Sequence, residues 1–239
     1  MRILHVSDFH AREEWFHWLL GQTRSGQFDC CVFTGDFLDI RPTASRSVLE
    51  QIQFLQAWLA YHQGCPLFVC TGNHDYWGAL DRPAGLPPEF DEAGWIFGMG
   101  LSSLVQVDFD PIDFGPFQIQ ARKWQETAGF VPSSQTKPVL LLNHAPPEGA
   151  RTAVDRDGML GGDFELGAMA DYLPKGSLIL SGHVHHAEDW HDVLGKTVCL
   201  NPGMNEKRDA LFPNHIVIDT ERRRAEFRSV NGPLGPVRI

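Results

Sequence analysis

The stretch Leu67-Phe68-Val69-Cys70-Thr71-Gly72-Asn73-His74-Asp75 decides the fold, because an apolar run of strand length ends directly at a group of polar residues. The same order recurs at four other places, where apolar runs begin at Ile3, Cys30, Val139 and Leu178. Each run predicts a buried strand whose carboxyl end delivers polar side chains. Because open α/β sheets place their ligand sites at that end, we expect these side chains to converge on one crevice.

The polar residues at the five strand ends are of the types that bind metal ions. In chain order they are Asp8-Phe9-His10, Gly35-Asp36, Gly72-Asn73-His74-Asp75, Asn143-His144 and Gly182-His183-Val184-His185. A pair of cations about 3.5–4 Å apart needs a bridging anion, and a carboxylate gives one oxygen to each. Asp36 is the candidate for that bridge. The series therefore predicts a two-metal site.

The expected cofactors are two divalent or trivalent metal ions. Histidine supplies neutral nitrogen and asparagine a neutral carbonyl oxygen, a mixture that accepts Mn, Fe or Zn without selecting one. Two dications with Asp8, Asp36 and a bridging hydroxide leave a net charge of about +1 and attract an anionic ester. Coordination also lowers the pKa of bound water to roughly 7, which supplies a hydroxide for attack at phosphorus.

The ordered series resembles the calcineurin-like metallophosphoesterases, with the pattern D-x-H, G-D-x-x-D/Y, G-N-H-D/E, a lone H and G-H-x-H, over about residues 3 to 203. The resemblance implies an α/β fold, a four-layer α/β/β/α sandwich of two mixed sheets. It implies a first metal held by Asp8, His10, Asp36 and His185. It implies a second metal held by Asp36, Asn73, His144 and His183. Asn201-Pro202-Gly203 looks like the turn that often closes the pattern.

His74 and Asp75 are the expected catalytic residues. The resemblance makes His74 the acid for the leaving group or a stabiliser of the transition state. The Asp75 carboxylate follows directly and is expected to hydrogen-bond the imidazole, which would raise its basicity. Asp39 is interpreted either as an acceptor that orients a ligand histidine or as a helix cap, and His5 as a core histidine.

Composition limits the class of protein and its partners. The 239 residues are expected to form one domain over 1–239, since strand-like runs at 215–218 and 225–227 continue past the last motif. The net charge of -10 argues against binding extended nucleic acid. The five cysteines lack metal-ligand spacing and are interpreted as reduced core residues. No signal peptide or membrane span is apparent, so we expect a cytoplasmic protein without membrane contact.

Helices are predicted where apolar residues recur at helical spacing. Val48, Ile52, Leu55 and Leu59 predict a crossover helix, with Ser45 or Thr43 as its cap and Gly64 as its end. Further helices are expected over 13–20 and 164–173. The alternating runs 104–107 and 117–120, joined by a turn over 110–116, predict a β-hairpin. Loops 76–94 and 145–162 follow predicted ligands, and they are expected either to shape the substrate pocket or to be variable surface connections.

The preferred function is hydrolysis of phosphodiester bonds in a small molecule or nucleotide. Asp39 stands where purple acid phosphatases carry tyrosine, and Cys70-Thr71 precedes the motif where protein phosphatases carry arginine. Lipid-A pathway hydrolases carry arginine in place of His74. The alternatives are a DNA nuclease of the Mre11/SbcD type, a phosphomonoesterase, or a non-catalytic scaffold of the same fold. Oligomeric state is not readable from the sequence.

Overall fold

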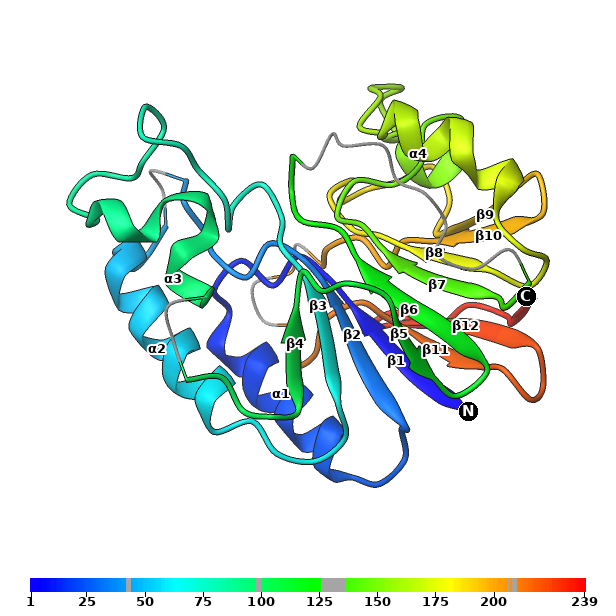
Figure 1. The fold of residues 1–239 in the computed structure, drawn as a ribbon, viewed down its shortest axis with the longest axis horizontal. Helices are drawn as coiled ribbons and strands as arrows, with labels where there is room; N and C mark the ends of the chain where they lie inside the picture. The colour runs from blue at the N-terminus through cyan, green and yellow to red at the C-terminus, as the bar shows by residue number, and fades with distance from the viewer. Residues whose placement is uncertain (42–43, 98–99, 126–135, 206, 208–209) are drawn as a thin grey trace.

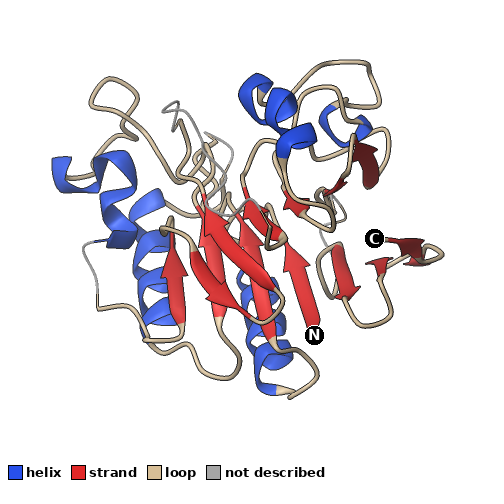
Figure 2. Cartoon of the chain, turned by 45° about the vertical axis from the view of Figure 1, so that its right-hand side comes forward, coloured by secondary structure: helices blue, strands red, loops and turns tan. Residues whose placement is uncertain are grey.

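Two mixed β-sheets face each other in the computed structural model, which describes residues 1–41, 44–97, 100–125, 136–205, 207 and 210–239 (Figures 1 and 2). In these residues the first sheet runs β13 (Gly232–Pro233), β12 (Arg224–Ser229), β11 (His215–Asp219), β1 (Arg2–Val6), β2 (Cys30–Thr34), β3 (Leu67–Cys70) and β4 (Val105–Val107), with β14 (Val237–Arg238) beside β12. The second runs β5 (Ile112–Phe114), β6 (Phe117–Ala121), β7 (Val139–Leu142), β8 (Leu178–Leu180), β10 (Thr197–Leu200) and β9 (His191–Leu194).

Helices cover the outer face of each sheet, so the predicted order of layers is confirmed. Helices α1 (Glu13–Arg24) and α2 (Val48–Ala60) pack on the first sheet through a core that includes Phe16, Phe33 and Leu55. Helix α4 (Phe164–Met169) covers the second sheet through Leu166 and Ile179. Between the sheets lies a third apolar core. Short helices α3 (Gly94–Phe97), η1 (Pro88–Ala93), η2 (Arg151–Ala153) and η3 (Ala170–Tyr172) lie in the connections.

The strands alternate between these cores, which explains their continuous apolar sequences. Along β2, Cys31 and Phe33 face the helices, whereas Cys30 and Val32 face the second sheet. Both faces of the central strands are therefore buried, as is typical of parallel sheets covered on both sides. The order β1, α1, β2, α2, β3 confirms the strands predicted to begin at Ile3, Cys30 and Leu67 and the two helices predicted between them.

Helix α2 begins and ends at residues other than those predicted. Its cap is Ser47, whose hydroxyl accepts from the Glu50 N–H at 3.3 Å while the Glu50 carboxylate accepts from the Ser47 N–H at 2.9 Å. Because Ser47 forms this reciprocal capping box, it caps the helix instead of the predicted Ser45. The alternative cap, Thr43, lies outside the described residues. The helix ends at Ala60, before Gly64. Helix α1 extends four residues past the predicted Leu20, to Arg24.

The predicted hairpin between 104–107 and 117–120 is wrong. Strand β4 pairs in parallel with β3 in the first sheet, whereas β6 pairs with β7 in the second. The true hairpin joins β5 to β6 through Gly115-Pro116, inside the segment interpreted as a turn. Alternation identifies a strand but not its partner, and here the chain crosses between sheets. Among the described residues, no helix is long and apolar enough to cross a membrane.

Candidate metal centre

The carboxyl ends of β1, β2 and β3 in the first sheet and of β7 and β8 in the second carry all the predicted ligands. Main-chain hydrogen bonds join neighbouring ends: the Asp8 N–H donates to the Gly35 carbonyl at 3.0 Å, and the Gly182 N–H to the His144 carbonyl at 2.9 Å. The site therefore forms where the two sheets meet.

The backbone at this edge is strained. Asp8, His10, Asp36 and His183 have φ values of 56°, 44°, 60° and 65°, in the left-handed region that non-glycine residues rarely occupy. Such conformations cost about 1–3 kcal/mol each and are concentrated at functional sites. Gly72 has no room for a side chain, because a Cβ would collide with the Asp36 carboxylate and main chain. The strain turns the polar side chains toward one another.

The first cluster comprises Asp8, His10, Asp36 and His185, which offer donor atoms all within 4.8 Å of one another. His10 Nε2 lies 3.0 Å from His185 Nε2 and 3.8 Å from Asp36 Oδ2. His185 Nε2 lies 3.3 Å from Asp8 Oδ1. Two nitrogens and two carboxylates thus face a common point, as expected of the first metal site.

The second cluster comprises Asn73, His144 and His183 and lies next to Oδ1, the other carboxylate oxygen of Asp36. His144 Nε2 is 3.3 Å from Asp36 Oδ1 and 3.0 Å from Asn73 Oδ1, and His183 Nδ1 is 2.8 Å from the same Asn73 oxygen. Asp36 therefore presents Oδ2 to one cluster and Oδ1 to the other. This is the geometry required of a bridging carboxylate.

Hydrogen bonds behind the rings fix which nitrogen faces the site. His10 Nδ1 donates to the Leu38 carbonyl at 3.2 Å, and His144 Nδ1 to the Thr34 carbonyl at 2.6 Å. In the neutral rings Nε2 then carries a lone pair, which points at carboxylate or amide oxygens that also carry lone pairs. Opposed lone pairs call for a proton or a cation between them, and metal-bound histidines characteristically make such outer hydrogen bonds. The donor set fits a pair of metal ions.

The electrostatics of the buried groups agree with this donor set. Burial lowers the pKa of His10 to about 4 and that of His183 to about 4. The pKa of His144 is raised to about 9, because the charge of Asp36 outweighs the opposing effect of burial. Despite burial, the pKa of Asp36 is lowered by His144, so it remains a carboxylate.

Asp75 does not contact the imidazole of His74, which corrects the predicted pair. Its carboxylate instead accepts from four backbone N–H groups, those of Asp36, Phe37, Leu38 and Gly72, at 2.8 to 3.2 Å. The side chain is fully buried. It ties the loop after β2 to the loop after β3, so it positions Asp36.

His74 lies beside the first cluster, with its ring centroid 4.6 Å from that of His10. Its Nδ1 accepts from the Ile40 N–H at 3.4 Å. The neutral ring therefore carries its hydrogen on Nε2. His74 is thus set up as a hydrogen-bond donor.

The structure tests the two interpretations of Asp39. Its carboxylate accepts from Arg41 Nε at 2.7 Å and Arg41 Nη2 at 2.8 Å, and Ser47 caps the helix instead. Gln51 of α2 bonds its main chain at 2.8 and 2.9 Å. Asp39 thus fixes Arg41, and its carboxylate also lies within 4.8 Å of ring nitrogens of His10 and His74, so the structure excludes only the helix-cap interpretation. His5 is a buried core residue whose Nε2 bonds the Thr34 hydroxyl at 3.0 Å.

Trp124 is a site residue that the sequence did not single out. Its ring centroid lies 5.4 Å from those of both His144 and His183, so it packs against two expected ligands. The Trp124 N–H donates to the Thr71 hydroxyl at 3.1 Å. Trp124 follows the carboxyl end of β6. The other site residues were found because they follow predicted parallel strands, and Trp124 would have been found in the same way if β6 had been predicted as a parallel strand.

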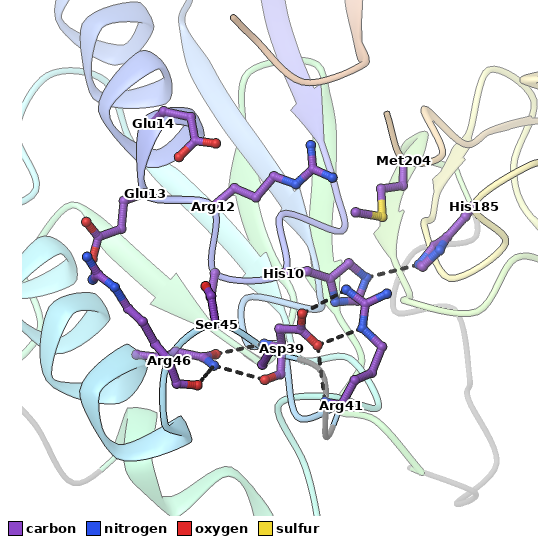
Figure 3. A pocket seen from close by; sticks show the side chains of 13 residues that line it. His10, Arg12, Glu13, Glu14, Asp39, Arg41, Ser45, Arg46, His185 and Met204 are labelled. Atoms are coloured by element: carbon purple, nitrogen blue, oxygen red, sulfur yellow. Dashed lines mark hydrogen bonds and ion pairs between the residues drawn. The ribbon is translucent and has the colours of Figure 1, made fainter. Parts of the chain in front are cut away.

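A hollow of about 770 Å³ opens beside the first cluster and ends at His10 and His185 (Figure 3). Arg12 and Arg41 both extend toward that end of the hollow (Figure 3). Arg12 Nη1 donates to the Lys207 carbonyl at 2.9 Å, and its guanidinium lies 4.3 Å from the Trp15 ring centroid. The hollow gives a substrate access to the cluster.

The calcineurin-like phosphoesterase family profile matches residues 1–187. This chain belongs to the calcineurin-like phosphoesterase family. No curated protein sequence matches it significantly.

Solved structures share the fold across nearly the whole chain. YfcE, a phosphoesterase from E. coli, has 12% identity, with 100% of both chains covered and a TM-score of 0.52. TT1561 of Thermus thermophilus has 13% identity, with 99% of this chain and 98% of its own covered and a TM-score of 0.53. A novel archaeal phosphodiesterase has 14% identity, with 96% and 100% covered and a TM-score of 0.53. At these identities the likeness shows the fold alone.

Proposed function

We propose that this protein is a metal-dependent phosphodiesterase that hydrolyses a small-molecule or nucleotide diester. The observation that carries the proposal is the Asp36 carboxylate, whose two oxygens face two separate clusters of nitrogen and oxygen donors. Asp8, His10, Asp36 and His185 would hold one metal ion, and Asp36, Asn73, His144 and His183 the other. When bound, a metal pair supplies positive charge at the phosphoryl oxygens and makes water a stronger nucleophile.

Residues of the chain itself would orient the ester. His74 Nε2–H is available to donate to an oxygen that gains charge as the ester bond breaks. Asp75 acts indirectly, because it holds the loop that carries Asp36. Arg41, fixed by Asp39, would direct its guanidinium at the substrate in the hollow.

Charge balance favours a diester over a monoester. A metal site with a net charge of about +1 matches a singly charged diester, whereas a dianionic monoester needs further cations. Arg41 pairs with Asp39, and Arg46 pairs with Glu13. The positive charges of these two arginines, which line the hollow, are therefore already balanced by carboxylates. Arg151, in the loop over 145–162 that follows His144, pairs with Asp189 at 3.0 Å and with Asp192 at 3.8 Å. Phosphodiesterase is also the activity in the name of the archaeal structure that shares the fold.

Metal content tests the core of the proposal. Protein reconstituted with Mn should bind about two equivalents, and Asp36→Asn should bind far less, because the bridging charge is lost. Asp113→Asn is the matched control and should keep its metal, since the exposed Asp113 carboxylate pairs with Lys137 at 2.7 Å and is not an expected ligand. Elemental analysis measures both. Failure of the wild-type protein to bind metal under replete conditions would refute the proposal.

Substrate preference tests the diester assignment. The ratio of kcat/KM for bis(p-nitrophenyl) phosphate to that for p-nitrophenyl phosphate, at matched metal and pH, should exceed one. A clear preference for the monoester would contradict the assignment. Digestion of linear DNA faster than either ester would favour the nuclease alternative.

A further inference from the structure

Two separate hollows border the first cluster, and they come together at its residue His185. Besides the hollow of about 770 Å³ next to His10, a second of about 700 Å³ borders His185 from the other direction. The two share His185 and Met204 and otherwise have different linings. Met204 is fixed there, because its N–H donates to the His185 carbonyl at 3.1 Å. A phosphodiester bound at the cluster has two organic arms, and each hollow can take one.

The two linings differ in chemistry. The first hollow is lined by charged side chains, among them the pairs Arg41–Asp39 and Arg46–Glu13. The second is bordered by the charged residues Arg156, Glu188 and Asp189 as well, but it adds the aromatic rings of Trp190 and Phe227, whose centroids are 5.8 Å apart, and the glycine and proline residues of 232–235. Charged residues line both hollows, and the second adds ring faces and flat backbone, which fit a flat ring.

Asn205, which borders the second hollow, carries an unused hydrogen-bond donor. The residue is 8% exposed, and its Nδ2 is buried with no hydrogen-bond partner among the described residues. The orientation of this amide is fixed, because Oδ1 accepts from the Lys207 N–H at 3.1 Å. A buried donor without a partner costs free energy unless a ligand supplies an acceptor. Asn205 lines the hollow that Trp190 borders.

The segment that carries this donor is held rigidly. Asn201 Nδ2 donates to the carbonyls of Gly182 and Val184, both at 3.0 Å, and Gly203 N–H donates back to Asn201 Oδ1 at 2.7 Å. The residues around Asn205 are thereby tied to the turn that carries His183 and His185. A ring bound beside Asn205 would keep a fixed position relative to the cluster.

We infer that the second hollow binds a nucleobase, so that the substrate is a nucleotide diester with its base against Trp190 and an acceptor of the base on Asn205 Nδ2. The inference rests on the proposed phosphodiesterase function and names its substrate class. Stacking of a base on an aromatic side chain and one hydrogen bond together raise affinity on the order of tenfold or more. The other arm then leaves through the first hollow.

Two esters with the same leaving group and the same charge test the inference. The p-nitrophenyl ester of thymidine 5′-monophosphate carries a base, and methyl p-nitrophenyl phosphate does not. Wild-type kcat/KM should be at least about tenfold higher for the thymidine ester. Trp190→Ala should bring the ratio of the two efficiencies close to one. Asn205→Asp should lower the ratio severalfold, because it keeps the acceptor used by Lys207 and removes the unpaired donor, while the negative charge that it adds acts on both esters, which carry the same charge.

A binding measurement separates this inference from the proposed function. Saturation-transfer NMR with thymidine alone should show transfer to the base protons in the wild-type protein and loss of that transfer in Trp190→Ala. Trp18→Ala, which changes a half-buried tryptophan outside both hollows, is the control and should keep the wild-type ratio and transfer. Hydrolysis of both esters with a ratio near one would overturn the inference alone. Thymidine binding without hydrolysis of any ester would overturn the proposed function instead.

Discussion

At the scale of single residues, three buried aspartates differ because their neighbours differ. Asp8 and Asp36 face ring nitrogens, whereas Asp75 faces only backbone N–H groups. The first two are arranged to balance cationic charge, and the third holds two loops together. The sequence suggested a different role for Asp75, because it is adjacent to His74. Consecutive residues in a loop, however, point in different directions.

His74 is predicted to act through Nε2–H. His74→Ala should lower kcat by roughly 10²-fold or more, since a positioned proton or hydrogen-bond donor contributes about that much. His74→Gln, which retains an N–H donor, should lose less. Metal content should stay near the wild-type value in both variants, because the residue is not an expected ligand. Kinetics with a series of leaving groups provides the check: the loss should shrink for good leaving groups, and an equal loss across the series would exclude this role.

At the scale of elements, helix α2 both packs in the main core and holds a segment of the candidate site. Its apolar face includes Ile52, Leu55 and Leu59 in the main core, while Gln51 bonds the main chain of Asp39 beside the hollow. The first turn of this helix therefore fixes the segment that carries Asp39 and Arg41. Its capping box is an accessible place to test that connection.

Ser47→Ala should lower the free energy of unfolding by about 1 kcal/mol, because it removes the hydroxyl that accepts from the Glu50 N–H. Ser45→Ala, at one of the two cap positions predicted from the sequence, should cost much less, since the helix does not begin there. Urea unfolding measures both. Equal losses for the two variants would contradict the observed cap.

The ends of the strands were predictable from the sequence, because an apolar run and the polar residues that follow it are neighbours in the chain. A run such as Val139–Leu142 can only be a buried strand, and Asn143-His144 must follow at its end. Which strands pair with one another was not predictable, because strand pairing depends on residues far apart in the sequence. Phe117–Ala121 is predicted to pair with the run 104–107, yet it pairs with β5 on one side and lies parallel to β7 on the other, and this carries Trp124 to His144. The unpaired Nδ2 of Asn205 has no signal in the sequence either, since it depends on how the chain closes around it.

At the scale of the whole molecule, the site depends on the packing of the two sheets. Asp8, Asp36 and Asn73 come from the first sheet, and His144, His183 and His185 from the second. Neither sheet holds a complete cluster, so metal binding and the packed sandwich stabilise each other. The core between the sheets, with Ile3, Val32, Leu140 and Leu180, therefore contributes to the geometry of the centre.

The stability of the fold should also depend on pH through His215, which is far along the chain from every expected ligand. His215 is 6% exposed, packs against Trp18 and Phe212, and donates from Nδ1 to the Pro213 carbonyl at 2.9 Å. Burial lowers its pKa to about 4. Between about 4 and the unfolded value near 6.5 the unfolded chain binds the proton more tightly, so stability is full above pH 6.5 and falls as the pH decreases toward 4.

The His215→Gln variant isolates this effect. The wild-type protein should lose roughly 3 kcal/mol more than the variant between pH 7.5 and 4, an upper value set by the size of the pKa shift. Urea unfolding of both metal-free proteins across this range supplies the difference, in which the other histidines cancel. The variant can be less stable at pH 7.5 through lost packing, so the slope with pH is the deciding quantity. Parallel curves would mean that His215 is protonated without cost in the folded protein, and that its contacts with Trp18 and Phe212 do not exclude water as the structure indicates.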